Sequence, residues 1–81
     1  MRPGRGEVWD RLGAPTEQVG SVNDPRTREE HGVTWNEQWV YLGDDGKTVE
    51  RIVLWLRYDL VGVFRIKPDG SAERESFGTE S

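Results

Sequence analysis

The sequence predicts an α+β fold, in which a four-stranded antiparallel meander sheet carries one short N-terminal helix on one of its faces. Residues 33–77 are dense in β-branched and aromatic residues with turn signals between them, which is typical of short strands. Residues 1–32 are rich in Gly, Pro, Asp and Asn and hold one short stretch with helical periodicity. A chain of 81 residues has room for one helix layer on one sheet. We therefore expect a single small domain over residues 1–77 and a disordered tail over 78–81.

The predicted strands follow from side-chain alternation and from the turns that bound them. Val33, Trp35, Trp39 and Tyr41 alternate with polar residues, which predicts a strand over Val33–Leu42 with these four side chains on one face. The remaining strands are expected at Thr48–Arg57, Val61–Lys67 and Ser71–Phe77, the last as a polar edge strand. The turns between the strands are residues 43–46, 57–60 and 67–70, of which the middle one lacks glycine.

Gly6–Leu12 is the helix candidate of the first region. Val8, Trp9 and Leu12 form one apolar stripe, Gly13 follows where a C-terminal cap belongs, and a proline comes two residues later. A helix of two turns is unstable alone, so we expect it to dock on the sheet and to carry Trp9 into the core. Beyond it, residues 16–22 are expected as a short strand or extended loop, and residues 26–32 as a polar loop or brief helical turn.

Charge and composition exclude several classes of function. The formal net charge is −4 and the charges are well mixed, so the basic surface that binds nucleic acid or an anionic membrane is missing. The chain has no cysteine, which excludes disulfides and thiolate metal sites and favours a reducing, cytoplasmic location. We also expect no signal peptide and no membrane span. Nine arginines against two lysines indicate a bacterial source.

No cofactor or metal ion is expected from the motifs. The ten glycines form neither a dinucleotide-binding nor a phosphate-binding pattern, and the single histidine, His31, has no partner for a zinc set. Asp44-Asp45-Gly46 lacks the distal ligands of a calcium loop, so a plain hairpin is favoured. No catalytic set stands out from these residues.

The aromatic residues are the candidate binding residues. A helix of two turns covers one sheet face only, so if Leu54, Leu56, Phe64 and Ile66 face the helix, the opposite face stays open. Side chains of that open face would then form a partly exposed patch of the kind found at protein interfaces. Its members are Trp35, Trp39, Tyr41 and Trp55 as anchors, with Arg57 and Glu37 as polar groups. Alternatively, the segment 14–32 covers this face and the tryptophans are core. A homodimer that buries the open face is consistent with both accounts.

Glu37 supports an alternative function. It falls among apolar side chains, where a carboxylate must be paired or solvated. A salt bridge to Arg51 or Arg57, or a bulge that turns Glu37 outward, would explain it structurally. The alternative is a small-ligand binder or minimal enzyme of bacterial specialised metabolism, with an aromatic pocket around Glu37. In that case His31, Tyr58 or Asp59 would handle protons, whereas otherwise His31 is a solvated loop histidine.

Two short motifs resemble the SmpA/OmlA (BamE-like) lipoproteins of outer-membrane barrel assembly. Leu12, Gly13, Pro15 and Thr16 match the helix exit of that family, which is Leu-Gly-x-Pro-Thr. Trp39 and Tyr41 match the Trp-x-Tyr of the family's first long strand. The similarity extends over residues 6–67. The resemblance implies a helix-on-sheet fold and a protein-binding habit, which the similar β-lactamase-inhibitor scaffold shares. The acylated cysteine of the lipoproteins has no counterpart here, so their outer-membrane function is not implied.

Overall fold

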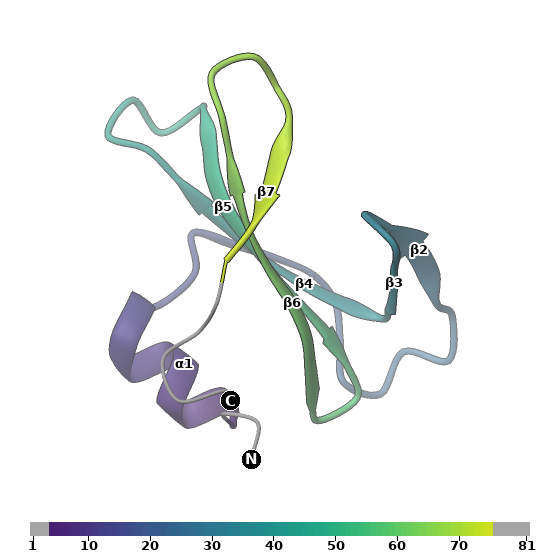
Figure 1. Cartoon of the computed structure of the whole chain (residues 1–81). Helices are drawn as coiled ribbons and strands as arrows, with labels where there is room; N and C mark the ends of the chain where they lie inside the picture. Colours follow the sequence, from purple (N-terminus) through teal and green to yellow (C-terminus); the bar gives the residue numbers. More distant parts are fainter. Residues whose placement is uncertain (1–3, 76–81) are drawn as a thin grey trace.

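A computed structural model describes residues 4–75 of the chain. The fold is one α-helix beside an antiparallel sheet of five strands and a separate two-stranded hairpin (Figure 1). The elements in chain order are α1 (Arg5–Leu12), β1 (Glu17–Gly20), β2 (Arg28–Glu30), β3 (Val33–Trp35), β4 (Glu37–Leu42), β5 (Val49–Leu56), β6 (Asp59–Ile66) and β7 (Ala72–Arg74). Among the described residues, no helix has the length and apolar character needed to cross a membrane.

The predicted α+β class and the meander are confirmed, but the predicted number of strands is wrong. The main sheet has the order β1-β4-β5-β6-β7, so the four predicted strands are joined by β1 at one edge. The segment expected as a strand or extended loop supplies β1, and the segment expected as a polar loop supplies β2. β7 is shorter than predicted, and residues 76–81, which include the predicted tail, lie outside the described residues.

The long strand predicted over Val33–Leu42 is interrupted at Asn36, which separates β3 from β4. Asn36 is 2% exposed, and its amide donates to the carbonyls of Val22 and Asp24 while its side-chain oxygen accepts from the backbone N–H of Arg57. Arg57 has a φ of 59°, which a residue with a side chain rarely adopts, and this hydrogen bond helps to hold it there. The side chain of Asn36 therefore ties the loop before β2 and the β5–β6 turn to the strand break.

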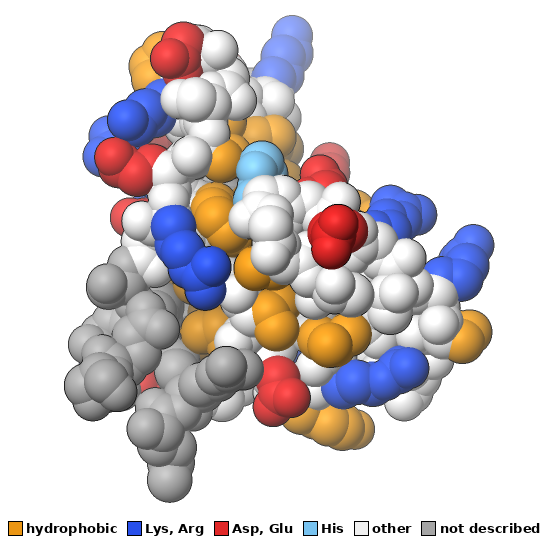
Figure 2. All heavy atoms as spheres, turned by 45° about the vertical axis from the view of Figure 1, so that its right-hand side comes forward, with side chains coloured by type: hydrophobic (Ala, Val, Ile, Leu, Met, Phe, Trp, Pro, Cys, Tyr) orange, Lys and Arg blue, Asp and Glu red, His pale blue; other side chains and the backbone are white. Residues whose placement is uncertain are grey.

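The interruption changes which face the tryptophans occupy. β3 leaves the main sheet, pairs with β2 and folds back over one face of the sheet. Trp35 on β3 consequently packs in a cluster with Val40, Ile52, Leu54 and Phe64, and not beside Trp39 as the alternation predicted. His31, at the tip of the β2–β3 hairpin, places its ring 5.0 Å from that of Phe64, and a band of hydrophobic side chains lies below the pale-blue histidine in Figure 2.

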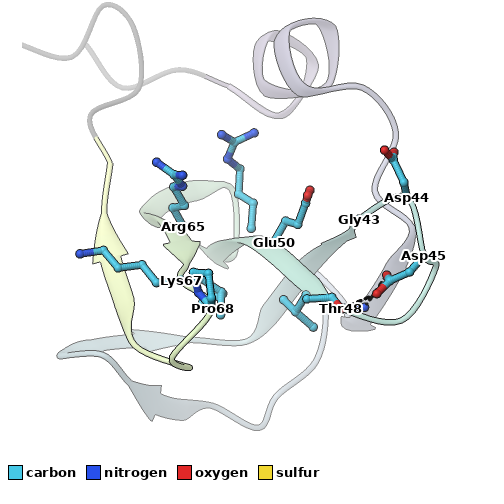
Figure 3. Close-up of a pocket in the computed structure, with 11 residues that line it drawn as sticks. Gly43, Asp44, Asp45, Thr48, Glu50, Arg65, Lys67 and Pro68 are labelled. Atoms are coloured by element: carbon cyan, nitrogen blue, oxygen red, sulfur yellow. Dashed lines mark hydrogen bonds between the residues drawn. The ribbon is translucent and has the colours of Figure 1, made fainter.

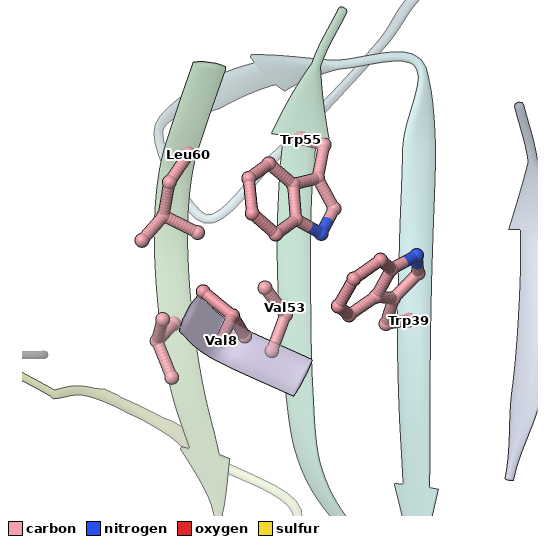
Figure 4. Packing of buried hydrophobic residues seen from close by; sticks show 6 residues of the cluster. Val8, Trp39, Val53, Trp55 and Leu60 are labelled. Atoms are coloured by element: carbon pink, nitrogen blue, oxygen red, sulfur yellow. The ribbon is translucent and has the colours of Figure 1, made fainter. Parts of the chain in front are cut away.

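The helix covers the other face. Val8 on α1 is fully buried against Trp39, Val53, Trp55 and Leu60, as the close-up in Figure 4 shows. This face is opposite to the one carrying Leu54 and Phe64, which the sequence assigned to the helix. Trp9, expected in the core, is instead 44% exposed and contacts the edge of the Trp39 ring.

Candidate functional site

The tryptophans predicted as binding anchors are core residues. Trp35 and Trp39 are 1% exposed and Trp55 is fully buried, so the expectation of a partly exposed aromatic face is wrong. The reason is that the two faces have different covers, α1 on one and the β2–β3 hairpin on the other. Tyr41 is partly buried at the margin and donates its hydroxyl to the carbonyl of Gly13 at 2.9 Å. Because these aromatic side chains fill the core, a contact surface must be sought elsewhere.

Glu37 is 3% exposed and is paired within the chain. Its two carboxylate oxygens accept hydrogen bonds from Arg5 at 2.6 and 3.0 Å, and one of them also accepts the indole N–H of Trp39 at 2.9 Å. Burial alone would raise the pKa of Glu37, but these hydrogen bonds and the Arg5 charge outweigh it and hold the pKa below its usual value. The partner comes from the helix, so the predicted bridge to Arg51 or Arg57 is not formed.

The side chains suggested for proton transfer are not brought together. His31 packs on Phe64, on the sheet face opposite to the cluster around Glu37 and Trp39. Tyr58 is 70% exposed at the β5–β6 turn, and Asp59 is exposed beside it. Arg57, a predicted binding residue, donates its guanidinium to the carbonyls of Val22 and Asp24 and acts as a loop support. In the described part of the chain, no group of three or more acidic or histidine side chains is placed to hold a metal ion.

A groove of about 700 Å³ lies at the end of the sheet that the helix does not cover. We call it the charged groove, and its size is typical of ligand-binding clefts. The β4–β5 hairpin and the end of β6 form it (Figure 3), through Gly43, Asp44, Asp45, Thr48, Val49, Glu50, Arg51, Arg65, Ile66, Lys67 and Pro68. In Figure 3 Arg65 and Lys67 lie on one side and the two aspartates on the other, with Glu50 between them. The groove therefore has a basic wall and an acidic wall.

Several charges of the groove have partners within the chain. Arg51 pairs with Glu75 at 2.8 Å, and Lys67 pairs with Glu73 at 3.3 Å. Asp45 accepts hydrogen bonds from the Thr48 hydroxyl and from the backbone of the turn, which lowers its pKa to about 2. Because these three side chains are already paired, they have little capacity to bind another molecule.

Arg65 differs from the other bases of the groove. It lies directly opposite Arg51 in the β5–β6 register, and like charges at such positions repel each other. Arg51 is neutralised by its acidic partner, whereas Glu73, opposite Arg65 on β7, pairs with Lys67 instead. Arg65 is exposed and makes no ion pair with any residue that the structure describes. The groove thus contains a guanidinium that forms no ion pair with any described residue.

Asp44 and Glu50 are the acidic counterparts of Arg65. Both are exposed, and within residues 4–75 neither side chain accepts a hydrogen bond or joins an ion pair. Sequence reasoning missed all three residues, since it treated the 43–46 turn as a plain hairpin and placed no function on Arg65. The register that sets Arg65 beside Arg51 depends on an irregularity between Leu54 and Trp55, which has no sequence signal.

Comparisons with known proteins identify no relative. The scan against protein-family models found no match, and neither a curated protein nor a solved structure matched the chain significantly. The helix-on-sheet arrangement that the SmpA/OmlA resemblance implied is present, but the relation to that family remains a prediction.

Proposed function

We propose that this chain is a small protein-interaction module whose contact surface is the charged groove. The observation that carries the proposal is the set of charges there that have no ion-pair partner within residues 4–75, Arg65 on one wall, Asp44 on the other and Glu50 between them. Unpaired charges on both walls favour a partner surface of mixed charge over nucleic acid. We also propose that the module acts in the cytoplasm of a bacterium, because the chain has no cysteine and far more arginine than lysine.

The alternative, a ligand pocket or minimal active site around Glu37, has less support. The carboxylate is occupied by Arg5 and Trp39, and Glu37 lines neither the charged groove nor the smaller cavity beside Trp35. With its pKa lowered, Glu37 is ionised at neutral pH and holds no proton to donate. Its environment is that of a structural ion pair.

Site-specific photo-crosslinking in the producing cells tests the proposal. We replace Pro68, an exposed residue of the groove lining, by p-benzoylphenylalanine and, as a matched control, replace Pro25, an exposed proline that does not line the groove. We expect protein adducts from position 68, few from position 25, and a loss of the position-68 adducts when Arg65→Glu is added. Equal yields at both positions, or no protein adduct at position 68, would contradict the proposed function.

A further inference from the structure

The distribution of charge in the groove limits what can occupy it. One wall carries Arg65 and the other carries Asp44, with Glu50 between them, and none of the three forms an ion pair with another described residue. An occupant of a single charge would satisfy one wall and be repelled by the other. The occupant must therefore present acidic and basic groups side by side, at the spacing of the two walls.

A surface with this arrangement is present on the chain itself. When two copies face each other across a two-fold axis that runs along the groove, the basic wall of each copy meets the acidic wall of the other. In this arrangement Arg65 of one copy approaches Glu50 and Asp44 of its partner copy, and the symmetry repeats the contact. Both arginines of the repelling pair, Arg51 and Arg65, would then have acidic neighbours.

From this self-complementarity we propose that the groove binds a second copy of the chain, as a two-fold dimer held by reciprocal Arg65–Glu50 contacts. The inference rests on the proposed function and names its partner. Pro68 lines the same groove and supplies apolar area beside the charged contacts.

The expected dimer is weak and depends on the short-range contacts. Exposed ion pairs contribute little individually, so the dimer should dissociate on dilution. Each copy has a formal net charge of −4, which opposes association at long range. At about 0.15 M salt this repulsion is screened beyond roughly 8 Å, while pairs in direct contact are screened much less. Physiological ionic strength is therefore the condition for the measurement.

Sedimentation velocity over a concentration series tests the inference with charge reversals in the full chain. We expect Arg65→Glu and Glu50→Arg each to weaken the dimer by roughly tenfold or more, because each brings like charges together across the axis. The double variant restores opposite charges and should recover most of the wild-type affinity. The control is Arg26→Glu, which makes the same charge change on an exposed loop residue that does not line the charged groove.

The outcomes separate the two proposals. A chain that stays monomeric at millimolar concentration, or a dimer that the groove variants leave unchanged, would overturn the second-copy inference. If adducts at position 68 then contain other proteins, the proposed function stands with a different partner. If position 68 gives no protein adduct either, both proposals fail. Reduced association of each single variant with recovery in the double variant supports the inference, since both positions are exposed and folding is checked by circular dichroism.

Discussion

The two ends of one sheet face differ in whether their charged side chains are paired within the chain. At the end covered by α1, the carboxylate of Glu37 is buried with Arg5 and the indole of Trp39 as partners. At the other end, Arg65 stands opposite Arg51 and has no counter-ion among the described residues. A buried charge needs a partner within the chain, whereas an exposed charge is solvated and remains available to bind another molecule. The covered end therefore accounts for stability, and the open end is where contact with another molecule is expected.

The covered end also explains the high aromatic content of a short chain. Trp39 and Trp55 lie 5.0 Å apart between ring centroids, and the guanidinium of Arg5 lies 5.1 and 5.3 Å from the two rings. Large side chains bury much area per residue, which a thin core needs. The indole N–H of Trp55 finds no hydrogen-bond partner among residues 4–75, and in Figure 4 its nitrogen points toward the ring of Trp39. Aromatic side chains and one partly buried ion pair thus supplement the aliphatic residues of this small core.

The largest predicted effect is the loss of Arg5 at the covered end. Arg5→Met leaves Glu37 buried with the Trp39 N–H as its remaining side-chain partner, and we expect it to lower the free energy of unfolding by about 2–4 kcal/mol. Urea denaturation followed by tryptophan fluorescence measures this loss. The control is the double variant Arg5→Met with Glu37→Leu, which removes both charges and should regain most of the stability. A single variant within about 0.5 kcal/mol of wild type would show that the pair is not structurally important.

Acid should weaken the covered end by a smaller amount. The pKa of Glu37 is lowered in the folded chain, so its contribution to stability is present above the ordinary pKa of a glutamate and is lost as the pH falls through the folded value. We expect the free energy of unfolding to be nearly constant from about pH 5 to 7 and to decline below about pH 4.5.

Urea titrations at several pH values distinguish Glu37 from the other acids. Glu37→Gln should show a shallower acid decline than wild type, because one carboxylate with a lowered pKa has been removed. Glu29→Gln, at an exposed position on β2, should retain the wild-type slope. The same slope in both variants would mean that Glu37 does not contribute to the acid sensitivity.

The local parts of the fold were predictable from sequence. Gly6–Leu12 was expected as a helix and α1 spans Arg5–Leu12, because an apolar stripe and the following glycine act over a few residues. β5 and β6 and the two glycine-containing turns followed from local patterns for the same reason, whereas the glycine-free turn predicted at 57–60 is shorter, because β6 begins at Asp59. The break at Asn36 was not predictable, because its hydrogen bonds join residues 12–21 positions away in the chain. Since the break decides where Trp35 packs, the face assignment failed with it.

The candidate site was less predictable than the fold. The sequence correctly indicated that Glu37 needs a partner, but nothing local shows that Arg5, 32 residues earlier, provides it. The groove depends on register shifts at Tyr41/Leu42 and Leu54/Trp55, which decide the side chains that stand opposite each other. Composition identified the aromatic residues as unusual, and packing showed that they belong to the core.

The smallest predicted effect concerns the open end and has the opposite sign. Arg65→Thr removes the like-charge neighbour of Arg51 and introduces a β-branched residue in a strand, while Glu73, opposite on β7, keeps Lys67 as its partner. We therefore expect the isolated monomer to become more stable by about 0.2–1 kcal/mol. Arg74→Thr is the matched control, because Arg74 donates to the carbonyl of Val61 and lies 5.7 Å from the ring of Phe64. That variant should lose stability in the same urea titration at low concentration. If Arg65→Thr raises the free energy of unfolding and also weakens self-association, then Arg65 lowers the stability of the monomer and contributes to binding, as expected for a contact residue. A loss of stability at Arg65 would instead place it among the residues that hold the sheet together and would remove the distinction between the two ends.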